Sequence, residues 1–161
     1  MQLTKDENRK LVEKYPFLKP KSRWTGKVRE DYDYKRTELD NMPDGWRIAF
    51  GEEMCAELKS IIEKYGVMEE YAILDIKEKY GELCWYDYGL ASVQEYFDWE
   101  HKYRLKSRRT CIRCGNKATK ISSGWISPYC DECATHLKSI QFVDLEEFYS
   151  VKDHKIAEEE Q

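Results

Sequence analysis

The residues best suited to chemistry are four cysteines in the segment CIRCGNKATKISSGWISPYCDEC, residues 111–133. They form two Cys-x-x-Cys pairs, Cys111/Cys114 and Cys130/Cys133. A tetrahedral zinc site needs four soft donors, and one tight turn with this spacing supplies two of them. Two such turns complete the set. We therefore predict one structural Zn²⁺ per chain, bound by these four side chains.

The residues around the two pairs predict a small module that holds the metal. Segments 117–122 and 125–127 have the composition of two short strands, and the second pair opens a helix candidate, DECATHLKSI. Gly115 suits a turn with a positive φ. A helix N-terminus also favours thiolates. The order of knuckle, hairpin and second knuckle on a helix resembles a treble-clef zinc finger.

The ligand set predicts a structural rather than a catalytic ion, because catalytic zinc keeps one position open for water. PYCDEC resembles half of the zinc-deaminase motif, but His101, the only upstream histidine, is followed by Lys and Tyr instead of x-Glu. HNH nucleases need a histidine between Cys111 and Cys133, where the sequence has none. We name no catalytic residue. His136 is an alternative to one cysteine ligand.

A basic run flanks the first cysteine pair. Residues 106–120 contain six basic residues and no acid. These side chains either form a phosphate-binding patch for nucleic acid or a nucleotide, or they offset the negative charge of a zinc ion bound by four thiolates. The net charge of −4 favours the second interpretation. The candidate anion-binding residues are Lys106, Arg108, Arg109, Arg113, Lys117 and Lys120.

The segment REDYDYKRTELD, residues 29–40, is the other candidate surface. If it is extended, Asp31 and Asp33 lie on one side and Tyr32 and Tyr34 on the other. Two carboxylates suit Mg²⁺ or acid–base chemistry, but no partner completes either motif, so we favour a salt-bridged loop with packed tyrosines. The candidate protein-binding residues are these four and Trp24.

Composition limits the setting of the protein. The chain has 161 residues, of which 36% are charged and 14% aromatic, which predicts a folded domain with a very polar surface. Neither a signal peptide nor a run of about 18 apolar residues is present, so we expect a cytoplasmic protein with no membrane association. Paired cysteines in a reducing compartment favour metal binding over disulfides. Cys55 and Cys84 lie within apolar patterns, which predicts buried free thiols.

Helical periodicity predicts the first elements. Thr4 and Glu7 form a capping box for a short helix that ends at Pro16. Residues 19–44 show no regular period and predict an ordered, irregular segment. Apolar residues recur at three- and four-residue steps over 46–65 and predict a helix that Gly66 ends.

An antiparallel hairpin and a further helix follow. In residues 72–76 we expect the apolar residues Ala72, Leu74 and Ile76 to alternate with their neighbours, as in a strand with one buried face. Gly81 marks the turn before a second strand over 83–88. Ser92 and Glu95 predict a second capping box for a helix that runs to Leu105. We therefore predict an α+β domain over residues 1–106, with helices packed on the hairpin, followed by a zinc-finger module over 107–143 and by a short helix with an acidic tail over 144–161.

Three stretches carry a resemblance to a known group: MPDGWRIAFGEEMC, DIKEKYGELCWYD and CIRCG…GWISPYCDEC. Together they resemble small uncharacterised proteins encoded by bacteriophages and prophages, over residues 10–135. The most specific parts are IKEKYG at 76–81 and GWISPYCDE at 124–132. Some relatives have His where this chain has Cys133. The resemblance implies a phage setting and zinc binding, and it brings no activity with it.

We therefore expect a non-catalytic, zinc-stabilised binding protein that engages a host protein or ribonucleoprotein. Inhibition of a bacterial defence system such as CRISPR is the specific hypothesis, because a small acidic protein can occupy a nucleic-acid channel. The alternative is a nucleic-acid or nucleotide-binding regulatory module that uses residues 106–120.

Overall fold

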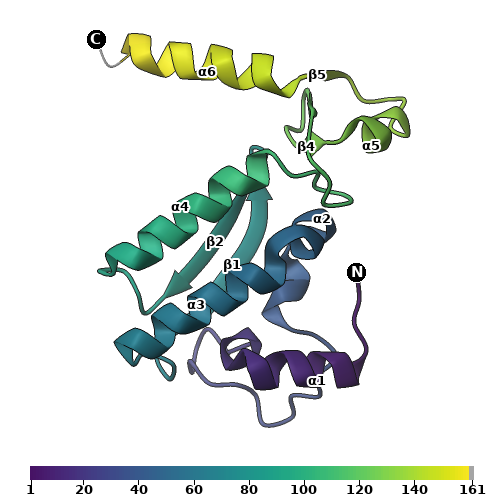
Figure 1. Ribbon diagram of the computed structural model, residues 1–161. Helices are drawn as coiled ribbons and strands as arrows, with labels where there is room; N and C mark the ends of the chain where they lie inside the picture. The colour runs from purple at the N-terminus through teal and green to yellow at the C-terminus, as the bar shows by residue number, and fades with distance from the viewer. Residues whose placement is uncertain (160–161) are drawn as a thin grey trace.

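The chain folds as the predicted α+β class: a run of helical elements precedes the antiparallel hairpin, and further helices and a second antiparallel sheet follow it (Figure 1). The computed structural model describes the backbone of residues 1–159 and the side chains of residues 1–152. The body of the molecule extends to the end of helix α4, and a smaller C-terminal part, with helix α6 at its outer end, lies above it in Figure 1.

The first helix, α1 (Lys5–Lys14), begins as its sequence predicts. The Thr4 hydroxyl accepts a hydrogen bond from the Glu7 N–H, and the Glu7 carboxylate accepts one from the Thr4 N–H at 2.8 Å. The helix ends at Tyr15, and a 3₁₀ turn, η1 (Pro16–Leu18), follows. A second 3₁₀ turn, η2 (Glu38–Asn41), is the one helical turn in the otherwise irregular segment after it.

The predicted helix over 46–65 is present but is not uniform. It comprises α2 (Asp44–Trp46), a π-type turn, η3 (Arg47–Gly51), and α3 (Glu52–Tyr65). Gly66 ends it with φ +65°, as predicted. The apolar period shows which side of a helix is buried but not how each turn is hydrogen-bonded, so it did not reveal the π turn.

Strands β1 (Ala72–Lys79) and β2 (Glu82–Tyr88) form the predicted antiparallel hairpin. Tyr80 and Gly81 connect them with φ +54° and +80°, the left-handed pair that a two-residue hairpin turn of this twist needs. Ile76 is paired with Trp85, and both side chains are buried. This pair fixes which face of the hairpin packs on the core.

The predicted alternation of Ala72, Leu74 and Ile76 is wrong at Leu74. A bulge between Ile73 and Asp75 turns Leu74 outward, and its side chain is exposed. An extra residue in one strand reverses the inside–outside order on either side of it. The single-strand pattern could not reveal the bulge, because the bulge is defined by the pairing with β2.

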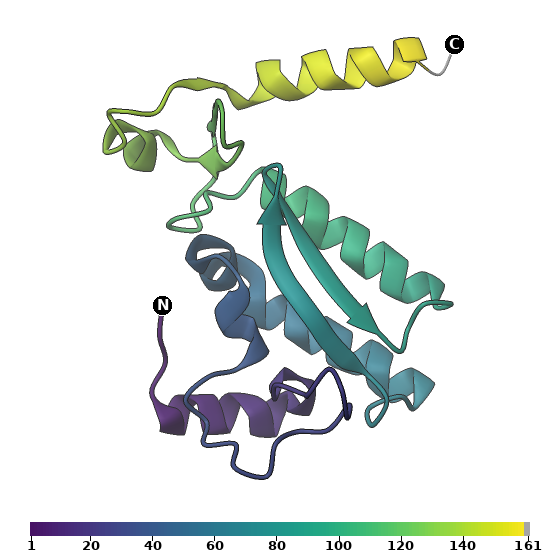
Figure 2. The same ribbon diagram turned by 180° about the vertical axis from the view of Figure 1, so that it is seen from behind.

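Helix α4 (Gln94–Arg108) begins without the predicted capping box. The N-cap residue is Val93, and no side chain caps the helix. Glu95 instead binds Lys64 at the end of α3. Helices α3 and α4 lie on one face of the hairpin, so its other face is uncovered in Figure 2, where both helices lie behind the strands.

The main core joins all these elements. Its largest fully buried side chains include Trp46 and Phe50 at the π turn and Tyr103 on α4, and Trp85 and Trp99 meet edge to face at 5.5 Å between ring centroids. Burial of this many aromatic rings supplies much of the free energy of folding.

The C-terminal part has its own sheet, in the order β4-β3-β5. Its elements are β3 (Lys120–Ser122), β4 (Pro128–Tyr129), α5 (Asp131–Thr135), β5 (Phe142–Asp144) and α6 (Leu145–Glu159). A small apolar cluster of Ala118, Ile121, Leu145 and Tyr149 fixes α6 to this sheet. Within the described residues, no helix has the length and apolar character needed to span a membrane.

Three expectations for this part were wrong. The second strand of the finger is Pro128–Tyr129 and not 125–127, and strand β5 was not predicted. Helix α6 is longer than the expected short helix, since it continues to Glu159 through the predicted acidic tail. The last two residues of that tail, 160–161, lie outside the described part of the chain.

Candidate metal centre

Cys111, Cys114, Cys130 and Cys133 form one compact cluster. Their sulfur atoms all lie within 4.8 Å of one another, and the Sγ atoms of Cys114 and Cys130 are 3.6 Å apart. Four sulfurs at about 2.3 Å from a zinc ion in a tetrahedron are about 3.8 Å from one another. The donor set and its spacing therefore fit a tetrahedral metal ion.

Backbone geometry preforms the first half of the site. The Cys111 carbonyl accepts a hydrogen bond from the Gly115 N–H at 3.0 Å. The Cys111 N–H donates one to the Asn116 carbonyl at 2.7 Å. Gly115 has φ +83°, the positive value predicted for it. This tight turn holds Cys111 and Cys114 side by side.

The second half of the site is built on α5. Cys130 is the N-cap of this short helix, and its sulfur accepts a hydrogen bond from the Cys133 N–H at 3.4 Å. Strand β4 leads directly into Cys130, and its partner strand β3 connects back to the first knuckle. The order of knuckle, hairpin and second knuckle on a helix is thus the predicted one.

Backbone amides favour the thiolate form of Cys111. Burial of this side chain opposes ionisation, but hydrogen bonds from the N–H groups of Cys130, Cys114 and Arg113 outweigh it and lower the pKa of Cys111 to about 7. A metal ligand must be deprotonated, and Cys111 ionises more readily than Cys133, because burial and the neighbouring thiols raise the pKa of Cys133.

The other cysteines and His136 do not belong to the cluster. All six cysteines are free thiols, which agrees with the expectation of metal ligands rather than disulfides. Cys55 is fully buried, and burial raises the pKa of its thiol to about 12, so it is inert. Cys84 is only partly buried, which corrects the prediction for that residue. His136 is the exposed C-cap of α5, and within the described residues the cluster contains cysteines alone.

The first knuckle is joined to the body of the protein. The Gly45 N–H donates to the Ile112 carbonyl at 2.9 Å, and the indole N–H of Trp46 donates to the Thr110 carbonyl at 2.9 Å. A Cβ atom on Gly45 would lie only 2.1 Å from the Cys111 carbonyl oxygen. The metal site is therefore in direct backbone contact with α2, although 66 residues separate Gly45 from Cys111.

The basic run at 106–120 is divided by its contacts. Lys106 binds Glu53, Arg108 binds Glu82, and Arg109 binds Glu146, each on a different element. Arg108 also lies 5.3 Å from the ring centroid of Tyr149, so it links α4 to α6. For these three residues, charge pairing within the fold is the better interpretation than phosphate binding.

The remaining three residues of the run lie in or next to the elements that hold the cysteines. Arg113 is part of the first knuckle, Lys117 is exposed, and Lys120 begins β3 beside Tyr129. Within the described residues none of them forms an ion pair. Their position fits charge compensation of a tetrathiolate centre, the second of the two interpretations of this run.

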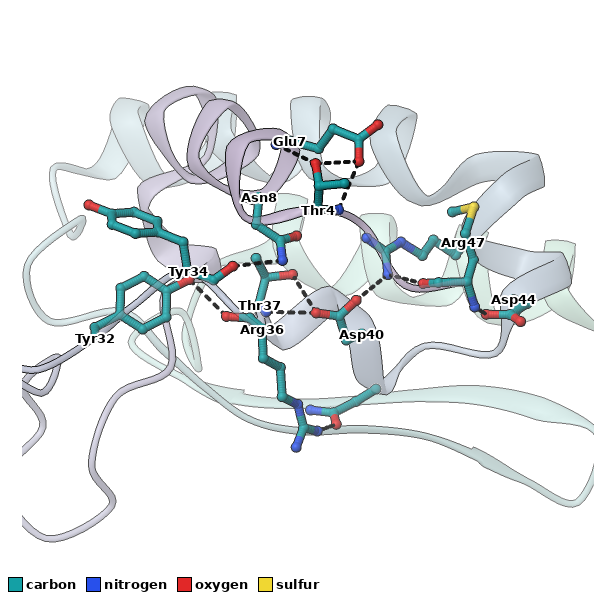
Figure 3. Close-up of polar contacts among 12 residues, drawn as sticks. Thr4, Glu7, Asn8, Tyr32, Tyr34, Arg36, Thr37, Asp40, Asp44 and Arg47 are labelled. Carbon is teal, nitrogen blue, oxygen red and sulfur yellow. Dashed lines mark hydrogen bonds and ion pairs between the residues drawn. The ribbon is translucent and has the colours of Figure 1, made fainter.

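The tyrosines of residues 29–40 pack together, as Figure 3 shows. Their ring centroids are 4.8 Å apart; the Tyr32 hydroxyl donates to the Arg36 carbonyl, and the Tyr34 carbonyl accepts from the Asn8 side chain. Arg9 lies 4.9 Å from the centroid of the Tyr34 ring. A packed pair of this kind belongs to the scaffold.

The two aspartates of the same segment are ion-paired. Asp31 binds Arg29, and Asp33 binds Lys5 and Lys35, which lower the pKa of Asp33 to about 2. The segment is not a regular strand, because Tyr34 has φ +61°. The contacts favour the salt-bridged loop over a metal or acid–base pair.

A buried arginine anchors this segment to the π turn. Arg47 donates to the Asp40 carboxylate at 2.5 Å and to the Met1 carbonyl at 3.3 Å, and Asp40 in turn accepts from the Thr37 N–H at 2.7 Å (Figure 3). The Arg47 side chain is only 4% exposed, so removing its partner would leave an unpaired buried charge. The irregular segment is therefore ordered by polar contacts.

Trp24 differs from the other candidate protein-binding residues. It is 97% exposed and lies in a tight turn closed by a bridge between Lys21 and Val28. Basic residues surround it: residues 19–29, KPKSRWTGKVR, contain five basic residues and no acid. That composition was the signal for a second basic surface.

Comparison of the chain with protein-family models, curated proteins and solved structures found no match.

Proposed function

We propose that the chain is a zinc-stabilised binding protein, and that its four clustered cysteines hold one structural Zn²⁺. The observation that supports this proposal is the cluster itself: four thiol sulfurs within 4.8 Å, drawn from two preformed turns. A tetrahedral set of four sulfurs selects zinc or an iron–sulfur centre among biological metals. Zinc is our choice because the order of knuckle, hairpin and helix is that of structural zinc modules.

The proposed role of the ion is to fasten the C-terminal part to the body. The first knuckle contacts α2 through Gly45, while the second knuckle leads through α5 to β5 and α6. Apart from the ion, the C-terminal part has short strands, a small apolar cluster and a few polar contacts to the body, such as that of Glu146 with Arg109. A small module with so little apolar burial needs an additional cross-link, which the ion supplies.

The proposed activity is binding of a host macromolecule. With all four positions taken by cysteine, the ligand set leaves no place for water or substrate on the ion. Large aromatic side chains, in contrast, are presented to solvent at several places, including Trp24 and Trp125. Exposed aromatic residues on rigid elements are typical of recognition surfaces.

The phage setting and the inhibition of a bacterial defence system are part of the same proposal. They rest on the resemblance of three sequence stretches to phage and prophage proteins and on the acidic net charge of −4, which suits competition for a positively charged channel. We propose that the protein acts in the cytoplasm of the host cell.

Affinity purification tests this proposal. Tagged protein is incubated with host lysate in parallel with a Cys114→Ser/Cys133→Ser variant of the same length. The intact protein is expected to retain one macromolecular partner in near-stoichiometric amount, and the variant is expected to retain less of it because its C-terminal part is not held. Absence of any partner with the intact, zinc-loaded protein contradicts the proposal.

A further inference from the structure

The uncovered face of the β1–β2 hairpin carries basic and aromatic side chains in pairs. The Lys77 ammonium lies 5.0 Å from the centroid of the Tyr86 ring, and the Lys79 ammonium lies 5.8 Å from that of Tyr80. Lys77 and Lys79 are two residues apart in one strand, so they project from the same face about 6.7 Å from each other. Figure 2 shows this face in front of α3 and α4 with no element over it.

Trp24 extends the same surface at one end of the hairpin. Arg23, its neighbour, donates to the Leu74 carbonyl on β1 at 2.8 Å. Arg23, Leu74, Lys77 and Tyr86 together line a cleft of about 300 Å³. The turn that carries the exposed indole is thus attached to the strand that carries the two lysines.

Trp125 extends the surface at the other end. It is 78% exposed, and it lines a cleft of about 260 Å³ together with Lys79 and Tyr80. Its indole N–H donates to the Glu78 carboxylate at 2.9 Å, which fixes the ring beside the hairpin turn. The finger and the hairpin therefore meet at one cleft beside the hairpin turn, which Glu78 also lines. We call the residues Trp24, Lys77, Lys79, Tyr80, Tyr86 and Trp125 the outer track.

The turn that carries Trp24 is rigid. The Ser22 hydroxyl accepts from the N–H groups of Trp24 and Thr25, and Lys21 donates to the carbonyls of Glu69 and Tyr71 at 2.9 and 2.8 Å. These bonds order the backbone of the turn, so a ligand that binds there does not have to order it. The Trp24 ring is thus exposed although the turn that carries it is ordered by hydrogen bonds.

The charge beside Trp24 is only partly compensated within the fold, by Glu38 near Arg23 and by Asp75 in the same cleft. Of the five basic residues at 19–29, only Arg29 has an ion-pair partner among the residues that the structure describes, namely Asp31. The other four leave a local positive charge in a protein whose net charge is −4. The run at 106–120 contrasts with this, because three of its six residues bind carboxylates.

We infer that the outer track binds single-stranded nucleic acid, with its lysines and arginines on the phosphates and its aromatic rings stacked on bases. Single strands are bound by positive surfaces with interspersed aromatic side chains, and every base offers a face for stacking. Bases in a duplex are already stacked on each other, so separate, fully exposed rings such as Trp24 and Trp125 find their best partners in a single strand. This inference rests on the proposed binding function and names the chemistry of the bound macromolecule; it differs from competition for a positively charged channel, because here the protein binds the nucleic acid itself.

Two carboxylates line the clefts of the track, Glu78 beside Trp125 and Asp75 beside Lys77, and the second supplies a test. Asp75 binds Lys77 at 2.8 Å, and both side chains are partly exposed. An exposed ion pair is weak, so a phosphate can replace the carboxylate. Asp75→Asn frees Lys77 and removes a negative charge, and it is therefore expected to tighten binding.

Fluorescence anisotropy with labelled 20-mers of dT and rU, and with a 20-base-pair duplex, measures the binding. We expect the zinc-loaded protein to bind the single strands more tightly than the duplex. For about four neutralised phosphates, log Kobs is expected to fall with log salt with a slope of about −3. Trp24→Ala should weaken binding roughly 10-fold through lost stacking. Lys77→Glu/Lys79→Glu should weaken binding to every sequence and make the salt slope shallower.

Two matched variants control for nonspecific effects. Phe97→Ala removes an exposed aromatic residue from α4, and Lys10→Glu reverses a charge on α1; both are expected to bind as the wild type does. Absence of binding to either single strand at low salt overturns the inference. Preference for the duplex, or equal binding by Trp24→Ala and the wild type, also overturns it.

A nuclease-treated pull-down separates this inference from the proposed function. A host protein that remains bound after nuclease treatment and is lost with Trp24→Ala contradicts the nucleic-acid assignment, while it leaves the binding function intact. A partner that is released by nuclease supports both.

Discussion

The amide of Gly45 donates a hydrogen bond to the carbonyl oxygen of Ile112, between two cysteines of the metal cluster, over 2.9 Å. The contact is so close that a Cβ on Gly45 would meet the Cys111 carbonyl oxygen at 2.1 Å. The backbone of the candidate metal centre thus packs directly against the backbone of α2, and a change at either one affects the other.

Gly45→Ala tests this contact, because the contact decides whether the substitution raises or lowers the free energy of unfolding. In a helix without tertiary contacts, Ala is more stable than Gly by about 1 kcal/mol. Here the added methyl group would overlap backbone atoms that cannot rotate away, so we expect a loss of about 1–3 kcal/mol in unfolding free energy. Chemical denaturation measures it. Ser60→Ala, on the exposed side of α3, is the matched control and should not destabilise the protein; a stabilised Gly45→Ala would contradict the contact.

Much of the body follows from its sequence. The Thr4–Glu7 capping box, the left-handed Gly66 and the Tyr80–Gly81 turn form as predicted, because each depends on local chemistry. The π turn, the bulge beside Leu74 and the start of α4 at Val93 were not predictable, because they depend on partners elsewhere in the chain.

In the candidate site, too, features set by local sequence were predictable and features set by distant partners were not. Cysteine spacing alone predicts the four sulfurs that the fold brings together. The partners of the basic run were not predictable, since Glu53, Glu82 and Glu146 lie on three elements distant in sequence. The second basic run around Trp24 was readable from composition and was overlooked.

Removal of Arg108 should destabilise the fold, whereas removal of Lys117 should not. Two nitrogens of Arg108 reach one oxygen of Glu82 at 2.7 and 2.6 Å, and both side chains are largely buried. Arg108→Gln is expected to lower the unfolding free energy by about 1–3 kcal/mol. Lys117→Gln, in the same run but exposed, serves as the control. Equal stability of the two variants would show that Arg108 is a free surface charge.

Asp87 should make stability depend on pH in an unusual direction. Burial raises its pKa above the ordinary 3.8, although hydroxyl groups of Tyr71 and Tyr96 donate to it. A raised carboxyl pKa stabilises the fold at low pH, and this contribution is lost as pH rises through the folded-state pKa. The difference in unfolding free energy between wild type and Asp87→Asn should therefore decrease from below pH 4 towards pH 7.

Asp33→Asn provides the opposite case. Lys5 lowers the pKa of Asp33 to about 2, so the contribution of this carboxylate is present above about pH 4 and is lost as pH falls towards 2. Denaturation curves of both variants between pH 2 and 7 should show slopes of opposite sign. Parallel slopes would contradict the assigned environment of Asp87.

The zinc content of protein purified without added metal tests the central claim most directly. Elemental analysis should give close to one zinc per chain, and Cys114→Ser should lose the metal together with hydrogen-exchange protection in residues 110–145, whereas Cys84→Ser, outside the cluster, should keep both. A wild-type protein that is free of metal yet fully protected in this segment would contradict the account.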